Sequence, residues 1–293
     1  MLKRANLLSI KVALLPKKLQ NQILYETNED IILVDFPFYN YRNNYQAKNW
    51  GDKLNPYLAS AISKSTVLPY QGILSNHREL PVYRVIGSNL KKKLPSHTIV
   101  WGHGFISYQD YPQTKPKHIA AVRGPLTRQK YLDAGIDCPQ VYGDVAILLP
   151  LYFNPKVTPK YELGIIPQWR DKNLEIIKKI TENSDTKLID VFSEIETFVK
   201  DILSCNAIIS SSLHGLIAAE SYGVPSAWVR LSENPLGDYF KYQDYYASFG
   251  IKDAMPYLPS DLKGNSNLSS LCTRKNPMSI ADSLLDSCPF RHD

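Results

Sequence analysis

The chain of 293 residues carries a formal net charge of +6 at neutral pH, and 44% of its residues are apolar. The length exceeds what most single hydrophobic cores support and predicts two domains, while the apolar content is typical of a soluble globular protein. The basic excess is moderate and spread along the chain, so it suits an anionic substrate or an anionic membrane surface better than nucleic acid. No stretch offers the ~20 apolar residues that a membrane-spanning helix needs.

Cysteine spacing and the N-terminus indicate where the protein works. The four cysteines form no CxxC pair and show no metal-ligand spacing. Lys11 interrupts the apolar run near the N-terminus, and no small-residue cleavage site follows it. We therefore expect a reducing compartment, no disulfide framework and no bound metal. The predicted location is the cytoplasm, with the inner face of the membrane as a candidate place of peripheral contact.

The first half of the chain alternates between short apolar runs and helical segments, as in an α/β fold. Strands are predicted at residues 31–36, 83–87, 98–102 and 118–123. A basic helical arm is predicted at 1–25, and further helices are predicted from Leu54 and from Pro125. Gly51 permits a tight turn before the helix at Leu54, and Asp52 can cap that helix.

Residues 152–160 contain two prolines and little periodicity, which predicts a linker. Beyond the linker, strands are predicted at 163–167, 187–191, 205–209 and 227–231, and helices at 172–182, 194–203, 216–222, 239–249 and 279–287. The sequence therefore predicts two α/β domains, residues 1–152 and 160–293. A cleft between two such domains is the usual place for a ligand site.

Six residues, Ser210-Ser211-Ser212-Leu213-His214-Gly215, connect the predicted strand 205–209 to the predicted helix 216–222. A turn at this place lies at the carboxyl end of a strand, where open α/β sheets bind ligands. It also opens a helix, whose free N–H groups and dipole favour an anion. One serine would suffice to cap the helix, so three hydroxyls and an imidazole favour an anion site that contains a titratable group.

Two strands of the first half also end in residues that suit a ligand. Gly102-His103-Gly104 ends the strand at 98–102, and glycines at such a turn let the backbone approach a ligand closely. Arg123 ends the strand at 118–123 beside a helix N-terminus, and its guanidinium can grip a carboxylate or a phosphate through two hydrogen bonds. A structural ion pair is the alternative role for Arg123.

Eight short blocks, in this order, resemble the polysaccharide pyruvyl transferase family: Asn49–Asp52, Trp101–Gly104, Val122–Thr127, Val141–Asp144, Gly164–Pro167, Ser211–Gly215, Tyr222–Pro225 and Lys241–Tyr246. The ordered set covers the chain from about residue 45 to 250 and is much more specific than any one block. The resemblance implies an α/β, GT-B-like fold of two Rossmann-type domains with an interdomain cleft.

The resemblance also implies a reaction. An enolpyruvyl group would pass from phosphoenolpyruvate to two hydroxyls of one sugar, giving a pyruvate ketal. The acceptor would belong to a bacterial-type surface polysaccharide, such as an exopolysaccharide or a capsule, or to its lipid-linked precursor. Phosphoenolpyruvate would lie in the second domain and the cleft, with the sugar mainly on the first domain. No cofactor is expected besides this donor substrate.

The positions that match the family supply the candidate site. His214 and Arg123 are the expected catalytic residues. Substrate-binding roles are expected for Asn49, Asp52, Gly102, His103, Ser211, Ser212, Leu213, Arg230 and Lys241. Family members commonly carry a basic residue where this chain has Ser212, and many have His where it has Gln168. These departures leave Arg123, Lys241 and Arg230 as candidate cations for the donor.

Ketal formation requires that the methylene carbon of the donor gains a proton while a hydroxyl attacks C2, phosphate leaves and a second hydroxyl adds. A group with a pKa near neutrality suits this proton transfer, and general acid–base action typically contributes about 10²–10⁴-fold. We therefore predict that His214 moves the proton, with a hydrogen bond to phosphate as its alternative role.

Two other functions fit the same architecture. One is a GT-B nucleotide-sugar glycosyltransferase. Retaining enzymes of that kind often place a second Glu eight residues after a first, and from Glu220 that position holds Trp228. The other is a non-catalytic glycan-binding protein, against which the presence of His214 and Arg123 argues. Release of phosphate from phosphoenolpyruvate in the presence of acceptor glycans distinguishes the three functions.

Overall fold

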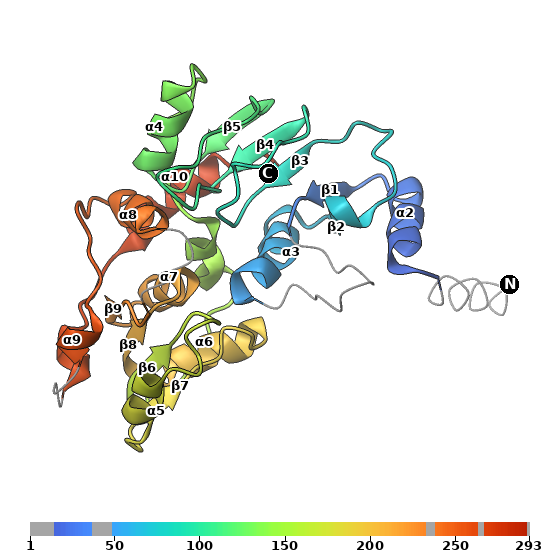
Figure 1. Ribbon diagram of the computed structural model, residues 1–293. Helices are drawn as coiled ribbons and strands as arrows, with labels where there is room; N and C mark the ends of the chain where they lie inside the picture. Colours follow the sequence, from blue (N-terminus) through green and yellow to red (C-terminus); the bar gives the residue numbers. More distant parts are fainter. Residues whose placement is uncertain (1–14, 37–48, 233–237, 263–266, 292–293) are drawn as a thin grey trace, which may run out of the picture.

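The computed structural model describes residues 15–36, 49–232, 238–262 and 267–291. These residues form a mixed α/β protein with two parallel sheets, one from each half of the chain (Figure 1). The predicted α/β class is confirmed, and the parallel sheets are compatible with Rossmann-like folds. The finer GT-B-like arrangement of two domains stays a prediction.

The first sheet has five strands in the order β2-β1-β3-β4-β5, and every neighbouring pair is parallel. The strands are β1 (Ile31–Val34), β2 (Thr66–Pro69), β3 (Val82–Arg84), β4 (Thr98–Trp101) and β5 (His118–Ala121). The chain runs outward from β1 to β2 and then returns to the other side of β1 as β3. The order of the strands therefore reverses between β1 and β3, where open α/β sheets bind ligands at their carboxyl ends.

The second sheet has four parallel strands in the order β7-β6-β8-β9. The strands are β6 (Tyr161–Ile166), β7 (Thr186–Leu188), β8 (Cys205–Ser210) and β9 (Ser226–Trp228). Here the order reverses between β6 and β8. Each sheet thus offers one place for a ligand, at the carboxyl ends of the two strands where the order reverses. The two places meet at the site described below.

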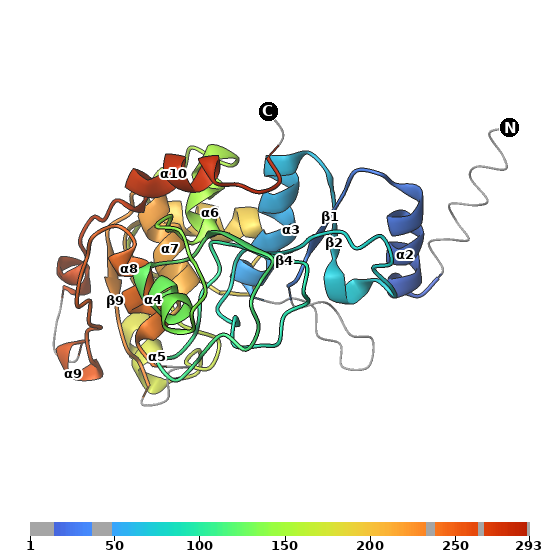
Figure 2. The same ribbon diagram turned by 90° about the horizontal axis from the view of Figure 1, so that it is seen from above.

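Helices cover both sheets. They are α2 (Lys17–Thr27), α3 (Trp50–Ser63), α4 (Pro125–Asp133), α5 (Glu175–Thr181), α6 (Ile195–Leu203), α7 (Leu213–Ser221), α8 (Phe240–Ala247), α9 (Pro259–Leu262) and α10 (Ala281–Asp286). Short 3₁₀ turns lie at Tyr70–Gly72, Val145–Leu151, Leu268–Leu271 and Pro277–Ile280. Both views place α2 and α9 at opposite ends of the molecule (Figures 1 and 2).

Two helices begin earlier than predicted, and both changes affect the site. Helix α3 begins at Trp50, and its cap is Asn49, whose Oδ1 accepts the N–H of Gly51 at 3.0 Å. The predicted cap, Asp52, lies inside the first turn. Helix α7 begins at Leu213, so His214 is a helical residue rather than part of the turn before the helix. Residues 1–14 of the predicted N-terminal arm lie outside the described residues.

A continuous hydrophobic core joins the two halves of the chain. It includes Trp50 of α3 and Phe198 of α6, whose ring centroids are 4.9 Å apart. The chain also returns to the first sheet near its C-terminus, where the carbonyl of Leu284 in α10 accepts the indole N–H of Trp101 at 3.0 Å. The predicted division at residues 152 and 160 stays a prediction: this core spans both halves, while smaller clusters lie within one half, around Leu33 in the first and around Ile209 in the second.

Candidate active site

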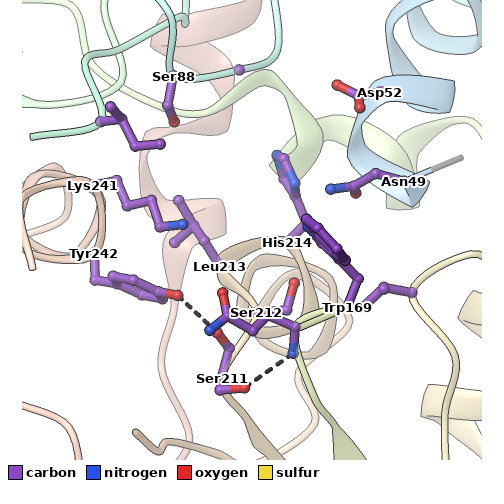
Figure 3. Close-up of a pocket in the computed structure, with 14 residues that line it drawn as sticks. Asn49, Asp52, Ser88, Trp169, Ser211, Ser212, Leu213, His214, Lys241 and Tyr242 are labelled. Atoms are coloured by element: carbon purple, nitrogen blue, oxygen red, sulfur yellow. Dashed lines mark hydrogen bonds between the residues drawn. The ribbon is translucent and has the colours of Figure 1, made fainter. Parts of the chain in front are cut away.

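A pocket of about 160 Å³ lies at the carboxyl ends of strands from both sheets. Its wall comes from the start of α3 (Asn49, Asp52), the loop after β3 (Gly87, Ser88), the loop after β6 (Gln168, Trp169), the β8–α7 turn (Ser211 to His214) and α8 (Lys241, Tyr242), with Ile106 and Val191 (Figure 3). Four of these segments follow β1, β3, β6 and β8, the strands where the order of each sheet reverses. Helix α8 follows β9, Ile106 follows β4, and Val191 follows β7. The pocket therefore lies where the ligand-binding carboxyl ends of both sheets meet.

The three serines of the β8–α7 turn make different contacts. Ser210 Oγ lies 2.8 Å from the carbonyl oxygen of Ile166 and accepts the N–H of Ser212 at 3.0 Å, which closes the turn. Ser211 Oγ donates to Asp171 Oδ2 at 2.8 Å and accepts the N–H of Gln168 at 3.0 Å. Ser212 lines the pocket, and its hydroxyl does not cap α7. Of the three hydroxyls predicted to bind an anion, that of Ser212 is the one without a hydrogen-bond partner in the described part of the chain.

His214 occupies the back of the pocket, directly against helix α3 (Figure 3). Its ring lies so close to Gly51 that a Cβ at that glycine would be 2.1 Å from Nδ1 and 2.2 Å from Cε1. Burial, followed by the charges of Lys241 and Arg123, lowers the pKa of His214 to about 3. The imidazole is therefore neutral at pH 7 in the unliganded protein. It can act as an acid only after a bound ligand has raised its pKa and the ring has taken up a proton.

Replacing Gly51 with alanine is expected to destabilise the protein and displace the His214 ring. At an open position in a helix, alanine is favoured over glycine by about 1 kcal/mol. Here the new methyl group would overlap the imidazole, and overpacking of this kind costs roughly 1–3 kcal/mol. Denaturant unfolding and the NMR signals of His214 are the measurements, with exposed Ser60→Ala on the same helix as control. Higher stability with unchanged His214 signals would contradict the packing described.

Asp52 places a carboxylate in the pocket wall (Figure 3). Among the residues that the structure describes, no hydrogen bond or ion pair holds this side chain. Burial raises the pKa of Asp52 to about 6, so the carboxylate is largely ionised at pH 7 and takes up a proton in mildly acidic solution. The site thus holds a titratable group with a pKa nearer neutrality than that of His214.

Lys241 brings a cation to the same pocket from α8. Its Nζ lies 5.0 Å from the ring centroid of Tyr242 and has no hydrogen-bond or ion-pair partner in the described part of the chain. Burial lowers the pKa of Lys241 to about 8, with a further contribution from Arg123. Tyr242 is itself held in place, because its hydroxyl donates to the carbonyl of Ser211 at 2.8 Å and its ring stacks on Trp228 at 4.3 Å.

Arg123 does not line the pocket. Its side chain is fully buried, with Nε and one terminal nitrogen each 3.0 Å from Oδ2 of Asp244 on α8. The same terminal nitrogen also donates to the carbonyl of Phe105 at 2.5 Å, and the second terminal nitrogen donates to Ser88 Oγ at 2.6 Å. These contacts are those of the structural ion pair considered as its alternative role, so this geometry does not support a direct grip on a donor. Its link to the pocket is indirect, through Ser88.

Three other predicted binding residues also lie away from the pocket wall. Gly102 has a φ of +80°, and a Cβ there would be 2.5 Å from Val145, so its position is set by packing. His103 is buried beneath the pocket, where its Nε2 lies 2.7 Å from Oδ1 of Asn89. Arg230 lines a small neighbouring cavity, and its guanidinium donates to the hydroxyl of Tyr239 at 2.9 Å. The structure therefore brings together Asn49, Asp52, Ser211, Ser212, Leu213, His214 and Lys241 from the predicted set.

Seven residues of the pocket wall were not predicted as site residues: Gly87, Ser88, Ile106, Gln168, Trp169, Val191 and Tyr242. Trp169 follows the Ile165-Ile166-Pro167 block, and its side chain is 49% exposed. A large aromatic residue at the end of a predicted strand was the available signal for it. Ser88 lies in a short loop without periodicity, so nothing in the sequence singled it out.

The described residues contain no group of three or more His, Cys, Asp or Glu side chains that could hold a metal ion. All four cysteines are free thiols. No helix in the described ranges is both long and apolar enough to cross a membrane.

Comparison with known proteins identifies the family. The family model of the polysaccharide pyruvyl transferases matches residues 18–233. The uncharacterized protein L143 of Acanthamoeba polyphaga mimivirus is 32% identical over 213 residues, which cover 70% of this chain and 72% of that protein. The succinoglycan biosynthesis protein ExoV of Rhizobium meliloti (strain 1021) is 27% identical over 219 residues, which cover 70% of this chain and 63% of that protein.

The chain belongs to the polysaccharide pyruvyl transferase family, as the eight sequence blocks predicted. It is therefore a pyruvyltransferase enzyme, and the family implies a polysaccharide acceptor. The chain spans slightly less than two thirds of the length of ExoV. The family match contains most of the pocket wall and ends before α8, which carries Lys241.

Proposed function

We propose that this enzyme transfers the enolpyruvyl group of phosphoenolpyruvate onto two hydroxyls of one sugar and leaves a pyruvate ketal. The acceptor in this proposal is a surface polysaccharide, such as an exopolysaccharide or a capsule, or its lipid-linked precursor at the inner face of the membrane. One observation carries the proposal. The ammonium of Lys241, without a partner among the described residues, shares a pocket with the N-terminus of α7 and with a neutral His214.

Phosphoenolpyruvate carries a carboxylate and a phosphate on one carbon, so its site needs several positive or hydrogen-donating groups. The first turn of α7 supplies N–H groups that have no partner inside the helix, and its dipole favours an anion. Lys241 supplies the charge, and Ser212 and Ser88 supply hydroxyls at the pocket wall. In this proposal Lys241 supplies the cation for the donor, while position 212 holds a serine.

The reaction needs one proton at the methylene carbon. A sugar hydroxyl forms a bond to C2 and loses its proton, and the electron pair of the double bond takes a proton at C3. The C2–O bond to phosphate then breaks, and phosphate leaves with its electron pair. The second hydroxyl adds to C2, loses its proton and closes the ketal. In this proposal His214 delivers the proton to C3, because the bound dianion favours its charged form.

The glycosyltransferase alternative lacks support from the pocket wall. Glu220, the carboxylate considered for it, is buried away from the pocket and accepts hydrogen bonds from Ser226, Tyr245 and Tyr246. The direct test is incubation of the wild-type chain with phosphoenolpyruvate and a panel of acceptor glycans. Phosphate release that depends on the acceptor, with a pyruvate ketal on the product, supports the proposal. Release of nucleotide from a sugar nucleotide instead would overturn it.

Replacing Lys241 with glutamine is expected to weaken phosphoenolpyruvate binding about 10- to 100-fold, because a charge-assisted hydrogen bond contributes about 1.5–3 kcal/mol. The wild-type affinity is expected to fall as the pH rises, since the ammonium loses its proton above its pKa of about 8. Calorimetric titrations at several pH values measure both effects. Lys252→Gln, at an exposed position, is the matched control. An affinity for Lys241→Gln equal to that of the wild type would exclude Lys241 from the donor site.

A further inference from the structure

The pocket has two sides of different chemical character. Lys241 and Tyr242 lie on one side of His214, while Asn49 and Asp52 lie on the other, and Trp169 is drawn below Asn49, away from Asp52 (Figure 3). The ammonium makes the first side the place for an anion. The carboxylate of Asp52 repels anions, so the second side suits a neutral molecule that offers hydroxyl groups.

The carboxylate of Asp52 makes no hydrogen bond or ion pair with the described residues, so it does not stabilise the fold through such a contact. The N-terminus of α3 is already capped by Asn49, and the neighbouring Lys53 points elsewhere, with its Nζ 2.7 Å from Glu194. A partly buried carboxylate without a hydrogen-bonding partner costs free energy. Such a group is typical of a functional site, where a ligand supplies the missing partner.

Trp169 gives the same side of the pocket a flat apolar surface. Its indole is 49% exposed, and the guanidinium of Arg170 lies 5.0 Å from its ring centroid. An aromatic ring can cover the C–H face of a sugar, and a carboxylate in the same pocket can accept its hydroxyl protons. Trp169 and Asp52 therefore offer the two contacts that a pyranose needs, one apolar and one polar.

We propose that Asp52 is the base that takes the proton from the attacking sugar hydroxyl, while Asn49 and Trp169 position the sugar. This inference rests on the proposed function. The O–H bond of the first hydroxyl breaks toward the carboxylate as its oxygen bonds to C2, and C3 takes its proton from His214. Phosphate then leaves, the proton of the second hydroxyl returns to His214, and Asp52 releases its proton to solvent, where the phosphate takes it up.

With Asp52 as the base, the pH–rate profile has an acid limb, a range in which the rate falls as the pH decreases. Burial raises the pKa of Asp52 to about 6, so below that pH the protonated carboxyl cannot accept a proton and the rate falls about tenfold per pH unit. The charged or titratable groups around it are His214 on α7, Lys241 on α8, Arg170 beside Trp169, and Lys53 on its own helix. Lys241, with a pKa of about 8, stays charged through this pH range, and the pKa of His214 lies near 3 in the unliganded protein.

The test is Asp52→Asn in the full chain, assayed with phosphoenolpyruvate and the acceptor that the wild type uses. The expected result is a loss of about 10²–10⁴-fold in the rate of acceptor-dependent phosphate release, with phosphoenolpyruvate affinity within about threefold of wild type. The acid limb near pH 6 should vanish from the residual rate. Asp282→Asn, an exposed aspartate in the first turn of α10, is the matched control and should change neither quantity.

Chemical rescue provides a second arm. Asp52→Ala leaves space where the carboxylate stood, so added formate should restore part of the rate, while formate should not affect Asp282→Ala. A wild-type rate or an unchanged acid limb in Asp52→Asn would overturn the inference and leave the proposed function standing. Absence of phosphate release by the wild type with every acceptor would overturn the proposed function, and this inference with it.

Discussion

Replacing His214 with glutamine is expected to stop phosphate release while leaving phosphoenolpyruvate bound. The amide of glutamine can donate a hydrogen bond to a phosphate oxygen, but it cannot take up and deliver a proton. The rate should therefore fall by about 10²–10⁴-fold, the range typical of general acid–base catalysis. Phosphate release and donor affinity are measured side by side, with His118→Gln at an exposed position as the control.

The protonation of His214 can be measured directly, as a change of its pKa on donor binding. In the unliganded protein the pKa of His214 is about 3, and a bound carboxylate and phosphate should raise it, because negative charge favours the imidazolium. NMR titration of the histidine with and without phosphoenolpyruvate measures this shift. If His214→Gln turns over at a rate near that of wild type, His214 serves as an anchor and another group protonates the methylene carbon.

The same substitution should change how stability depends on pH. The folded pKa of His214 lies below the unfolded value near 6.5, so the unfolded state binds a proton first. The stability that comes from the neutral imidazole is therefore fully present above pH 6.5 and is lost as the pH falls toward 3. His214→Gln removes this titration, and its unfolding free energy should decline less steeply over that range than that of wild type.

Replacing Asp244 with asparagine is expected to cause the largest loss of stability, about 3–5 kcal/mol, because it leaves the guanidinium of Arg123 buried without a counter-charge. Both side chains of this pair are 0% exposed. Asp244 also accepts the backbone N–H of Thr127 at 2.8 Å and its hydroxyl at 2.7 Å, so the change disturbs the start of α4. Denaturant unfolding measures the loss.

An exposed ion pair supplies the matched control for Asp244→Asn. Asp286 lies 3.6 Å from Arg291 at the surface, and Asp286→Asn should cost no more than about 1 kcal/mol. The double variant Arg123→Met with Asp244→Leu should recover part of the stability, since it removes both buried charges. A loss below about 1 kcal/mol for Asp244→Asn would show that the pair does not hold α4 and α8 together.

Short apolar runs located most of the strands, because fully buried parallel strands are nearly continuous in their hydrophobicity. The strand β2 (Thr66–Pro69) was missed because it ends in proline, which usually demotes a strand. The starts of α3 and α7 were placed too late because the second and third residues of each helix are polar or glycine. The β8–α7 turn was found because serines and a histidine interrupt an apolar run at the end of a strand.

The site was harder to predict wherever a side chain depends on a distant partner. Lys241 and Asp52 were identified from their blocks, but that neither has a partner among the described residues is a property of the folded chain. Arg123 looked available in the sequence because Asp244, which binds it, lies 121 residues further on. Trp169 and Ser88 reach the pocket only because two loops from different sheets happen to face each other.

The return of the C-terminal segment to the first sheet has a consequence for biosynthesis. The indole N–H of Trp101 bonds to the carbonyl of Leu284, which is synthesised 183 residues later. At 5–20 residues per second, this hydrogen bond cannot form until roughly 10–40 s after Trp101 has been added to the chain. During that time the first sheet is made but its partner helix α10 does not exist, and Lys241 is missing for most of it. The nascent chain therefore carries exposed apolar surface, and the pocket cannot form until Tyr242 of α8, the last of the described residues in its wall, has been made.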